Sequence, residues 1–72
     1  MKVAKTDLLR ALQLRYDHYS SQGVFEAACA KAGLDGEQAH FDRAQIAAFR
    51  TALARVGDRL QRVDERLDDL LG

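Results

Sequence analysis

The spacing of apolar residues in the C-terminal half of the chain constrains the fold more than any other feature. From residue 46 onward, large apolar side chains recur at alternating intervals of three and four positions without a slip. The set is Ile46, Phe49, Leu53, Val56, Leu60, Val63, Leu67 and Leu70. This is the heptad pattern with apolar first and fourth positions, and it is typical of helices that pack in a coiled coil.

Helix is also the regular structure that the rest of the chain favours. The chain contains no proline, and no segment shows the alternation of Val, Ile and Thr that is typical of strands. Alanine, leucine, arginine and glutamine, which are good helix formers, are abundant instead. With 72 residues there is room for one domain. The sequence therefore predicts an all-α fold in a single helical domain that spans residues 1–72.

Two short helices are expected in the N-terminal half. The first should span about 7–19, with Thr6 as its N-cap, and the second about 21–32, with Ser20 or Ser21 as its N-cap. Gly33 followed by Leu34 predicts a Schellman stop for the second helix. Residues 33–41 then form a connector. The first helix shows one apolar face, which includes Tyr16 and Tyr19.

A long third helix is expected over about 43–70. Asp42 and Gln45 have the spacing of a capping box, and only Gly57 weakens the helix beyond them. Such a helix would be roughly 42 Å long, whereas the two shorter ones would reach roughly 20 Å. The two short helices can therefore cover only the N-terminal half of the long one.

This mismatch in length leaves the second half of the apolar stripe uncovered. We call this part the C-terminal seam; it consists of Val56, Leu60, Val63, Leu67 and Leu70. A narrow apolar seam flanked by charge is typical of a contact between two helices. The predicted function is non-enzymatic protein association, as a dimerisation, adaptor or chaperone-like module. The partner would be a second copy or a helix of another protein.

The charges beside the seam bear on the orientation of that pairing. In a parallel pair, Arg59 of one helix would face Asp64 of the other. An antiparallel pair would instead bring Arg59 close to Arg66. The charges favour the parallel arrangement by a small margin, since exposed ion pairs contribute only ~0–1 kcal/mol. An exchange of the two short helices between subunits also stays open.

One flank of the seam is basic. We call this flank the arginine ridge; it consists of Arg55, Arg59, Arg62 and Arg66. Contact with phosphates, and hence nucleic-acid binding, is the alternative function. The competing interpretation is that these arginines pair locally with acids three or four positions away, such as Asp58 and Glu65. A formal net charge of zero argues against a dedicated polyanion binder.

No arrangement of residues indicates catalysis, a metal or a cofactor. Cys29 is the single cysteine, which excludes an internal disulfide, and it is interpreted as a small core residue. A metal site with His18 and His40 is disfavoured because no pair has the spacing of zinc ligands. The chain also shows neither a signal peptide nor an apolar run of roughly 20 residues. A cytoplasmic protein without membrane contact is expected.

Overall fold

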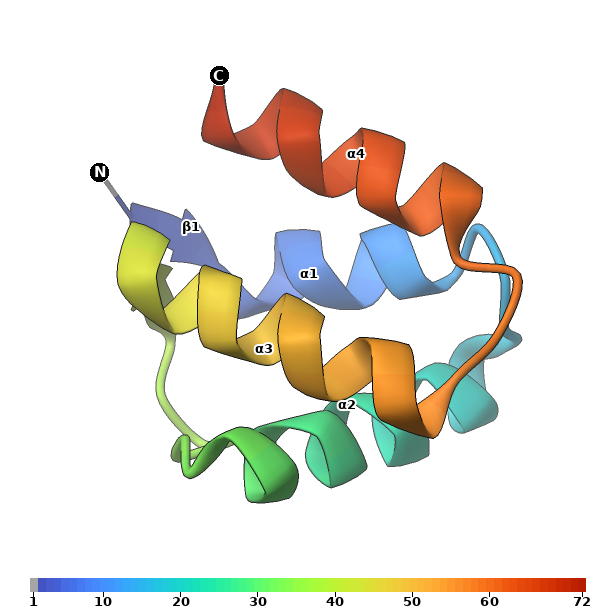
Figure 1. The fold of residues 1–72 in the computed structure, drawn as a ribbon, viewed down its shortest axis with the longest axis horizontal. Coiled ribbons are helices and arrows are strands. Elements are labelled where there is room, and N and C mark those ends of the chain that lie inside the picture. Colours follow the sequence, from blue (N-terminus) through green and yellow to red (C-terminus); the bar gives the residue numbers. More distant parts are fainter. Residues whose placement is uncertain (1) are drawn as a thin grey trace.

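The computed structural model describes residues 2–72 and orders them as two successive strand–helix–helix units (Figure 1). The elements are β1 (Lys2–Ala4), α1 (Lys5–Leu12), α2 (His18–Ala32), β2 (His40–Asp42), α3 (Arg43–Val56) and α4 (Gln61–Leu71). The predicted all-α, three-helix architecture is wrong, because the described residues form four helices and a two-stranded sheet. The predicted connector 33–41 is wrong in part, since its end belongs to β2.

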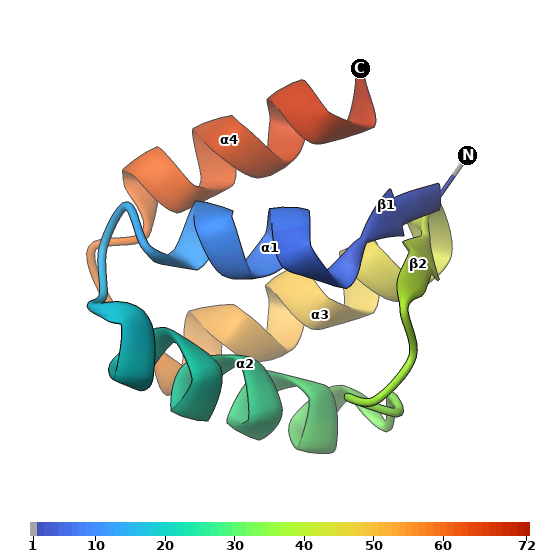
Figure 2. The ribbon, with the colours of Figure 1, turned by 180° about the vertical axis from the view of Figure 1, so that it is seen from behind.

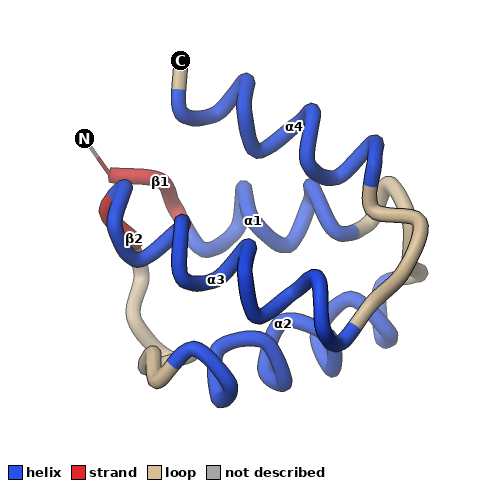
Figure 3. The backbone as a smooth tube through the Cα atoms, in the orientation of Figure 1, coloured by secondary structure: helices blue, strands red, loops and turns tan. Residues whose placement is uncertain are grey.

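The two strands form a short antiparallel ribbon at one end of the molecule (Figure 3). Val3 lies opposite Phe41 in the register, and both side chains are buried. The backbone N–H of Lys5 donates to the carbonyl of Ala39 at 2.8 Å, just beyond the ladder. Each strand has 3 residues and buries one side chain. It is therefore too short to show the alternation of apolar and polar residues by which strands are predicted.

The helices of the two units pack across each other. The second helix of each unit lies mainly on the first helix of the other, so that α2 contacts α3 and α4 contacts α1. Seen from both sides, α2 and α4 lie on opposite sides of the layer that α1 and α3 form (Figures 1 and 2). Neither unit could bury its apolar faces without the other.

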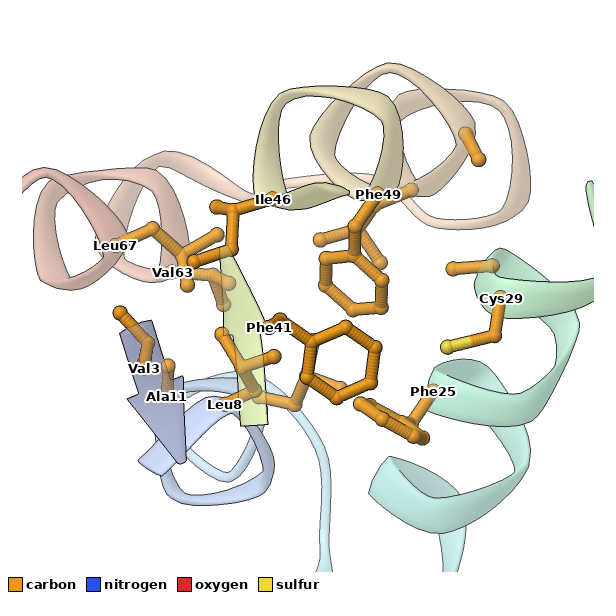
Figure 4. Packing of buried hydrophobic residues seen from close by; sticks show 14 residues of the cluster. Val3, Leu8, Ala11, Phe25, Cys29, Phe41, Ile46, Phe49, Val63 and Leu67 are labelled. Atoms are coloured by element: carbon orange, nitrogen blue, oxygen red, sulfur yellow. The ribbon is translucent and has the colours of Figure 1, made fainter. Parts of the chain in front are cut away.

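Three phenylalanines form the centre of the core where the units meet (Figure 4). The ring of Phe25 on α2 lies 5.8 Å from Phe41 on β2 and 5.5 Å from Phe49 on α3, centroid to centroid. The first pair is edge-to-face, at 84° between the rings, which is a favourable arrangement for aromatic side chains. Leu8 and Leu12 bring α1 into the same cluster.

The starts of the first two helices differ from the prediction. Ala4 precedes α1 without a side-chain capping bond, so Thr6 is not the N-cap. Asp17 caps α2 in place of Ser20 or Ser21, and its Oδ1 accepts from the backbone N–H of Ser20 at 2.7 Å. α1 ends at Leu12, so the helix predicted over about 7–19 is wrong at its C-terminal end. The extended backbone of Asp17 marks the start of α2 instead. Aspartate is a strong N-cap, and here it determines the boundary.

Two predicted boundaries are confirmed. Gly33 adopts a left-handed backbone with φ of 72°, and the N–H of Leu34 donates to the carbonyl of Cys29 at 2.8 Å, as in a Schellman motif. At the start of α3, the Gln45 backbone N–H donates to Asp42 Oδ1 at 2.8 Å, and the Asp42 N–H donates to Gln45 Oε1 at 2.9 Å. This is a complete capping box.

The predicted helix over 43–70 is broken between Val56 and Gln61. The chain leaves α3 through an extended Gly57, and α4 then runs back across the molecule (Figure 1). Val63 and Leu67 are 0% and 1% exposed, and they point into the core of their own chain (Figure 4). The reversal lets α4 cover α1, so one molecule buries both apolar faces. The heptad correctly indicates that Val63 and Leu67 lie on the buried face of α4. Its prediction that one helix continues from 43 to 70 is wrong.

Replacing Leu67 by alanine is expected to lower the free energy of unfolding by ~2–5 kcal/mol, because a fully buried leucine side chain is removed. Glu65→Ala, on the exposed face of α4, is the matched control and should change this free energy by at most about 0.5 kcal/mol. Urea unfolding followed by circular dichroism measures both. A loss for Leu67→Ala as small as that of the control would contradict the packing of α4 on its own chain.

Candidate functional site

The predicted partner-binding seam lies at the contact between α4 and the rest of its own chain. Val63 and Leu67 are buried, and the other three seam residues are partly buried against the core cluster. All five seam residues thus lie in or against the core of one molecule: Val56 on α3, Leu60 in the connection, and Val63, Leu67 and Leu70 on α4. The buried face of α4 packs mainly on α1, and arginine side chains join α4 to α3, so this face presents no open surface to a partner.

Two arginines of α3 hold the outer edge of α4. The guanidinium of Arg50 contacts Asp68 Oδ1 at 2.7 Å and Asp64 Oδ1 at 3.5 Å. Arg43 Nη2 donates to the carbonyl oxygen of Leu71 at 2.9 Å, which satisfies one of the carbonyls at the end of the helix. These contacts match the positions of side chains on α4, because Arg50 contacts two acids that lie four residues apart on that helix. Asp64, expected to face Arg59 of a partner, pairs within the chain instead.

Residues 57–60, which we call the hinge, connect α3 to α4 and contain the most strained backbone of the structure. Arg59 has a φ of 52°, and it is the single residue other than glycine with a positive φ in the range 2–72. A left-handed backbone costs a side-chain-bearing residue roughly 1–2 kcal/mol. Leu60 occupies the N-cap position of α4 and makes no side-chain capping bond. In contrast, α2 and α3 both begin at an aspartate that caps.

A second loop, residues 13–17, packs against the hinge. The phenol of Tyr16 lies so close to Gly57 that a Cβ at this position would overlap its hydroxyl oxygen. That hydroxyl is buried and has no hydrogen-bond partner among residues 2–72. A buried polar group without a partner is unfavourable by ~1–3 kcal/mol. The close approach therefore favours glycine, because a Cβ would displace the end of the tyrosine side chain, and the contact leaves an unsatisfied hydroxyl.

An ion pair closes the hinge from the outside. Arg15 Nη2 contacts Asp58 Oδ1 at 3.0 Å, and Arg15 Nε donates to the Asp58 carbonyl at 3.3 Å. The guanidinium also lies 5.0 Å from the centre of the Tyr16 ring. The Asp58 side chain is 77% exposed, so the pair contributes at most about 1 kcal/mol, and less at high salt.

Sequence reasoning missed Arg15, Arg43 and Arg50, and it gave other roles to Tyr16 and Asp58; these residues define the hinge and the polar edge of α4. Their contacts join residues far apart in the chain, so no local pattern reports them. The local signal for the break itself was available. Gly57 interrupts an otherwise strong helical segment, and a glycine inside a helix is unfavourable by about 1 kcal/mol relative to alanine.

The arginine ridge is divided by the break. Arg55 lines a groove between α2 and α3 together with Lys31, whereas Arg62 and Arg66 lie on α4, on the other side of the molecule (Figure 2). The local ion pairs expected for the ridge are not formed within residues 2–72. Asp58 and Asp64 pair with Arg15 and Arg50 instead. Arg59, Arg62 and Arg66 thus remain exposed cations beside or on α4.

Other reactive side chains are dispersed. Cys29 is buried in the core as predicted, and desolvation by burial raises the pKa of its thiol above the ordinary value. His18 lies at the start of α2 and His40 on the ribbon, both exposed. Within the described residues, no group of three or more His, Cys, Asp or Glu side chains could hold a metal ion. The contact of α4 with its own chain therefore stands as the candidate site.

Comparisons of the chain with protein-family models, with curated proteins and with solved structures found no match. Among the helices of residues 2–72, none combines the length and the apolar character that a membrane crossing requires.

Replacing Tyr16 by phenylalanine is expected to leave the free energy of unfolding unchanged or to raise it by about 1 kcal/mol. The change removes a buried hydroxyl without a hydrogen-bond partner and keeps the ring. Urea unfolding of the variant and of the wild type measures the difference. A loss of more than about 1 kcal/mol would mean that the hydroxyl is hydrogen-bonded in solution.

Proposed function

We propose that this chain is a non-enzymatic protein-association module and that α4 is its exchangeable element. We call the surface of α1 and α3 that α4 covers the groove. The residues of the C-terminal seam that lie on α4, Val63, Leu67 and Leu70, would pack in this groove, on their own chain or on another. The observation that carries the proposal is the combination of a specific groove with a strained connection. The groove has an apolar floor and the Arg50 edge, while the hinge holds a left-handed Arg59 and an uncapped Leu60.

The size of α4 supports this proposal. With 11 residues it is shorter than the roughly 12–15 residues at which isolated helices become marginally stable in water. The helix therefore depends on a groove for its structure. Full burial of Val63 and Leu67 contributes roughly 1.5–3 kcal/mol each, and ordering the segment offsets part of that gain. An element held by so few buried groups belongs to the parts of a protein that open first.

A labelled peptide of residues 57–72 tests the proposal with the full-length chain as receptor. In the Leu67→Ala variant the resident α4 is weakened, so the wild-type peptide is expected to occupy the groove. Fluorescence anisotropy should show at least tenfold tighter binding (about 1.4 kcal/mol) to this variant than to the wild-type chain. The peptide should also raise the Tm of the variant, since ligands that bind the folded state stabilise it.

A peptide with Leu67→Asp is the matched control and should not bind, because its carboxylate would be buried without a partner. The Glu65→Ala chain should bind the peptide as weakly as the wild type does. If millimolar wild-type peptide neither binds the Leu67→Ala chain nor changes its Tm, helix exchange is not a property of this protein.

Nucleic-acid binding is the second candidate function, and the exposed state of Arg59, Arg62 and Arg66 favours it. Without ion pairs within residues 2–72, these cations are available to phosphates. We expect binding to duplex DNA to weaken steeply with salt. Arg62→Gln with Arg66→Gln should reduce the slope of log K against log salt by about 2, roughly one per lost phosphate contact.

Lys31→Gln, on the opposite side of the molecule, is the control and should leave that slope unchanged. Titrations at several salt concentrations measure it. Absence of binding to DNA or RNA at low salt would end this second candidate.

A further inference from the structure

We infer that two copies of this chain exchange their α4 helices by opening the hinge, which produces a domain-swapped dimer. This inference rests on the proposed function and names the partner, a second copy. The exchange keeps the contacts of each α4 with a groove and changes only how the hinge connects them.

The closed hinge stores strain that opening would relieve. In the closed form, Arg59 has a φ of 52° and the Tyr16 hydroxyl is buried against Gly57 without a partner in the described chain. Once the hinge straightens, Arg59 can return to negative φ and Tyr16 can reach water. Both gains occur twice in a dimer. They oppose the entropic cost of bringing two molecules together.

The groove itself indicates a second copy as the partner. Arg50 contacts acids at positions 64 and 68, and Arg43 reaches the end of the helix at the Leu71 carbonyl. A partner helix must therefore carry apolar residues for the floor, two acids four residues apart on one flank, and its end at the correct distance. The α4 of an identical chain meets these conditions without adjustment, because the groove is already complementary to it.

The ion pair between Arg15 and Asp58 opposes the exchange. It joins the loop 13–17 to the hinge in the closed form, through contacts at 3.0 and 3.3 Å. Because the Asp58 side chain is largely exposed, the pair weakens as salt rises. The fraction of dimer should therefore increase with salt. A dimer formed by surface ion pairs would show the opposite dependence.

Hinge variants of the full chain test the mechanism by sedimentation at several concentrations. Gly57→Ala places a Cβ against the Tyr16 hydroxyl in the closed form, so it should raise the dimerisation constant. Arg59→Gly removes the penalty of the left-handed backbone and should lower it. A left-handed residue of the usual free-energy cost should change the dimerisation constant about tenfold per hinge, and about a hundredfold for the two hinges of a dimer. Gly23→Ala on α2 is the matched control and should change nothing, since no atom lies within 4 Å of the added Cβ.

A pair of charge-reversed chains distinguishes exchange from any other dimer. One chain carries Arg50→Glu, and the other carries Asp64→Lys with Asp68→Lys; each has like charges between its own groove and its own α4. Exchange between the two chains restores opposite charges at both grooves. We expect the equimolar mixture to form a heterodimer in preference to either homodimer, and to unfold at a higher Tm than either chain alone.

The outcomes separate this inference from the proposed function. A protein that stays monomeric in the Gly57→Ala form and in the charge-reversed mixture, yet binds the 57–72 peptide, overturns the second copy as partner and leaves helix exchange intact. A dimer without preference for the mixed pair, or with equal effects of Gly57→Ala and Gly23→Ala, also overturns the inference. If the peptide fails to bind as well, both proposals are wrong. If the charge-reversed chains do not fold separately, the dimerisation constants of the hinge variants test the inference without them.

Discussion

The packing of α4 on α1 determines most of this structure. A chain of 72 residues buries only about 60% of the surface it exposes when unfolded, so it has few apolar groups to spare. A straight continuation of α3 would leave the faces of both α1 and α4 in water. The reversal at the hinge buries Val63 and Leu67 within the same molecule. The left-handed backbone of Arg59 is unfavourable in free energy, but this cost is smaller than the free energy gained from the apolar burial that the reversal allows.

The same packing explains the relation between the two halves. Each half supplies one strand and two helices, and each second helix covers the first helix of the other half. The ribbon, with Val3 opposite Phe41, fixes where the halves begin relative to each other. The phenylalanine cluster then fills the space between them. The core is therefore shared, and α4 is the one helix at the edge of it that is attached through a strained loop.

Two local boundaries of the fold could be predicted from the sequence, whereas the caps of the first two helices and the contacts between distant residues were not predicted. The capping box at Asp42 and the stop at Gly33 depend on neighbouring residues, and both are confirmed. The apolar face of α4 was also identified, since Val63 and Leu67 belong to the predicted seam and are the most buried residues of α4. In contrast, Tyr19, predicted on the apolar face of the first helix, lies on α2 and is 84% exposed. The two strands were missed because three residues are too short to show a period.

The break after Val56 was missed for a different reason. A heptad specifies a face of a helix but not the molecule against which this face packs. Whether the seam meets its own chain or another depends on the balance between strain at Arg59 and the entropy of association. That balance is set by contacts such as Tyr16 with Gly57 and Arg15 with Asp58, which join distant parts of the chain. Candidate site residues could thus be named in advance, whereas their role inside the molecule could not.

Native-state hydrogen exchange of the α4 amides shows whether α4 is folded onto its own chain and can leave it. We expect the amides around Val63 and Leu67 to be protected and to exchange through a local opening. The free energy of this opening should be lower than that of the α3 amides around Phe49 and should depend little on denaturant. Unprotected α4 amides, or α4 and α3 amides that exchange with one common free energy, would contradict this expectation.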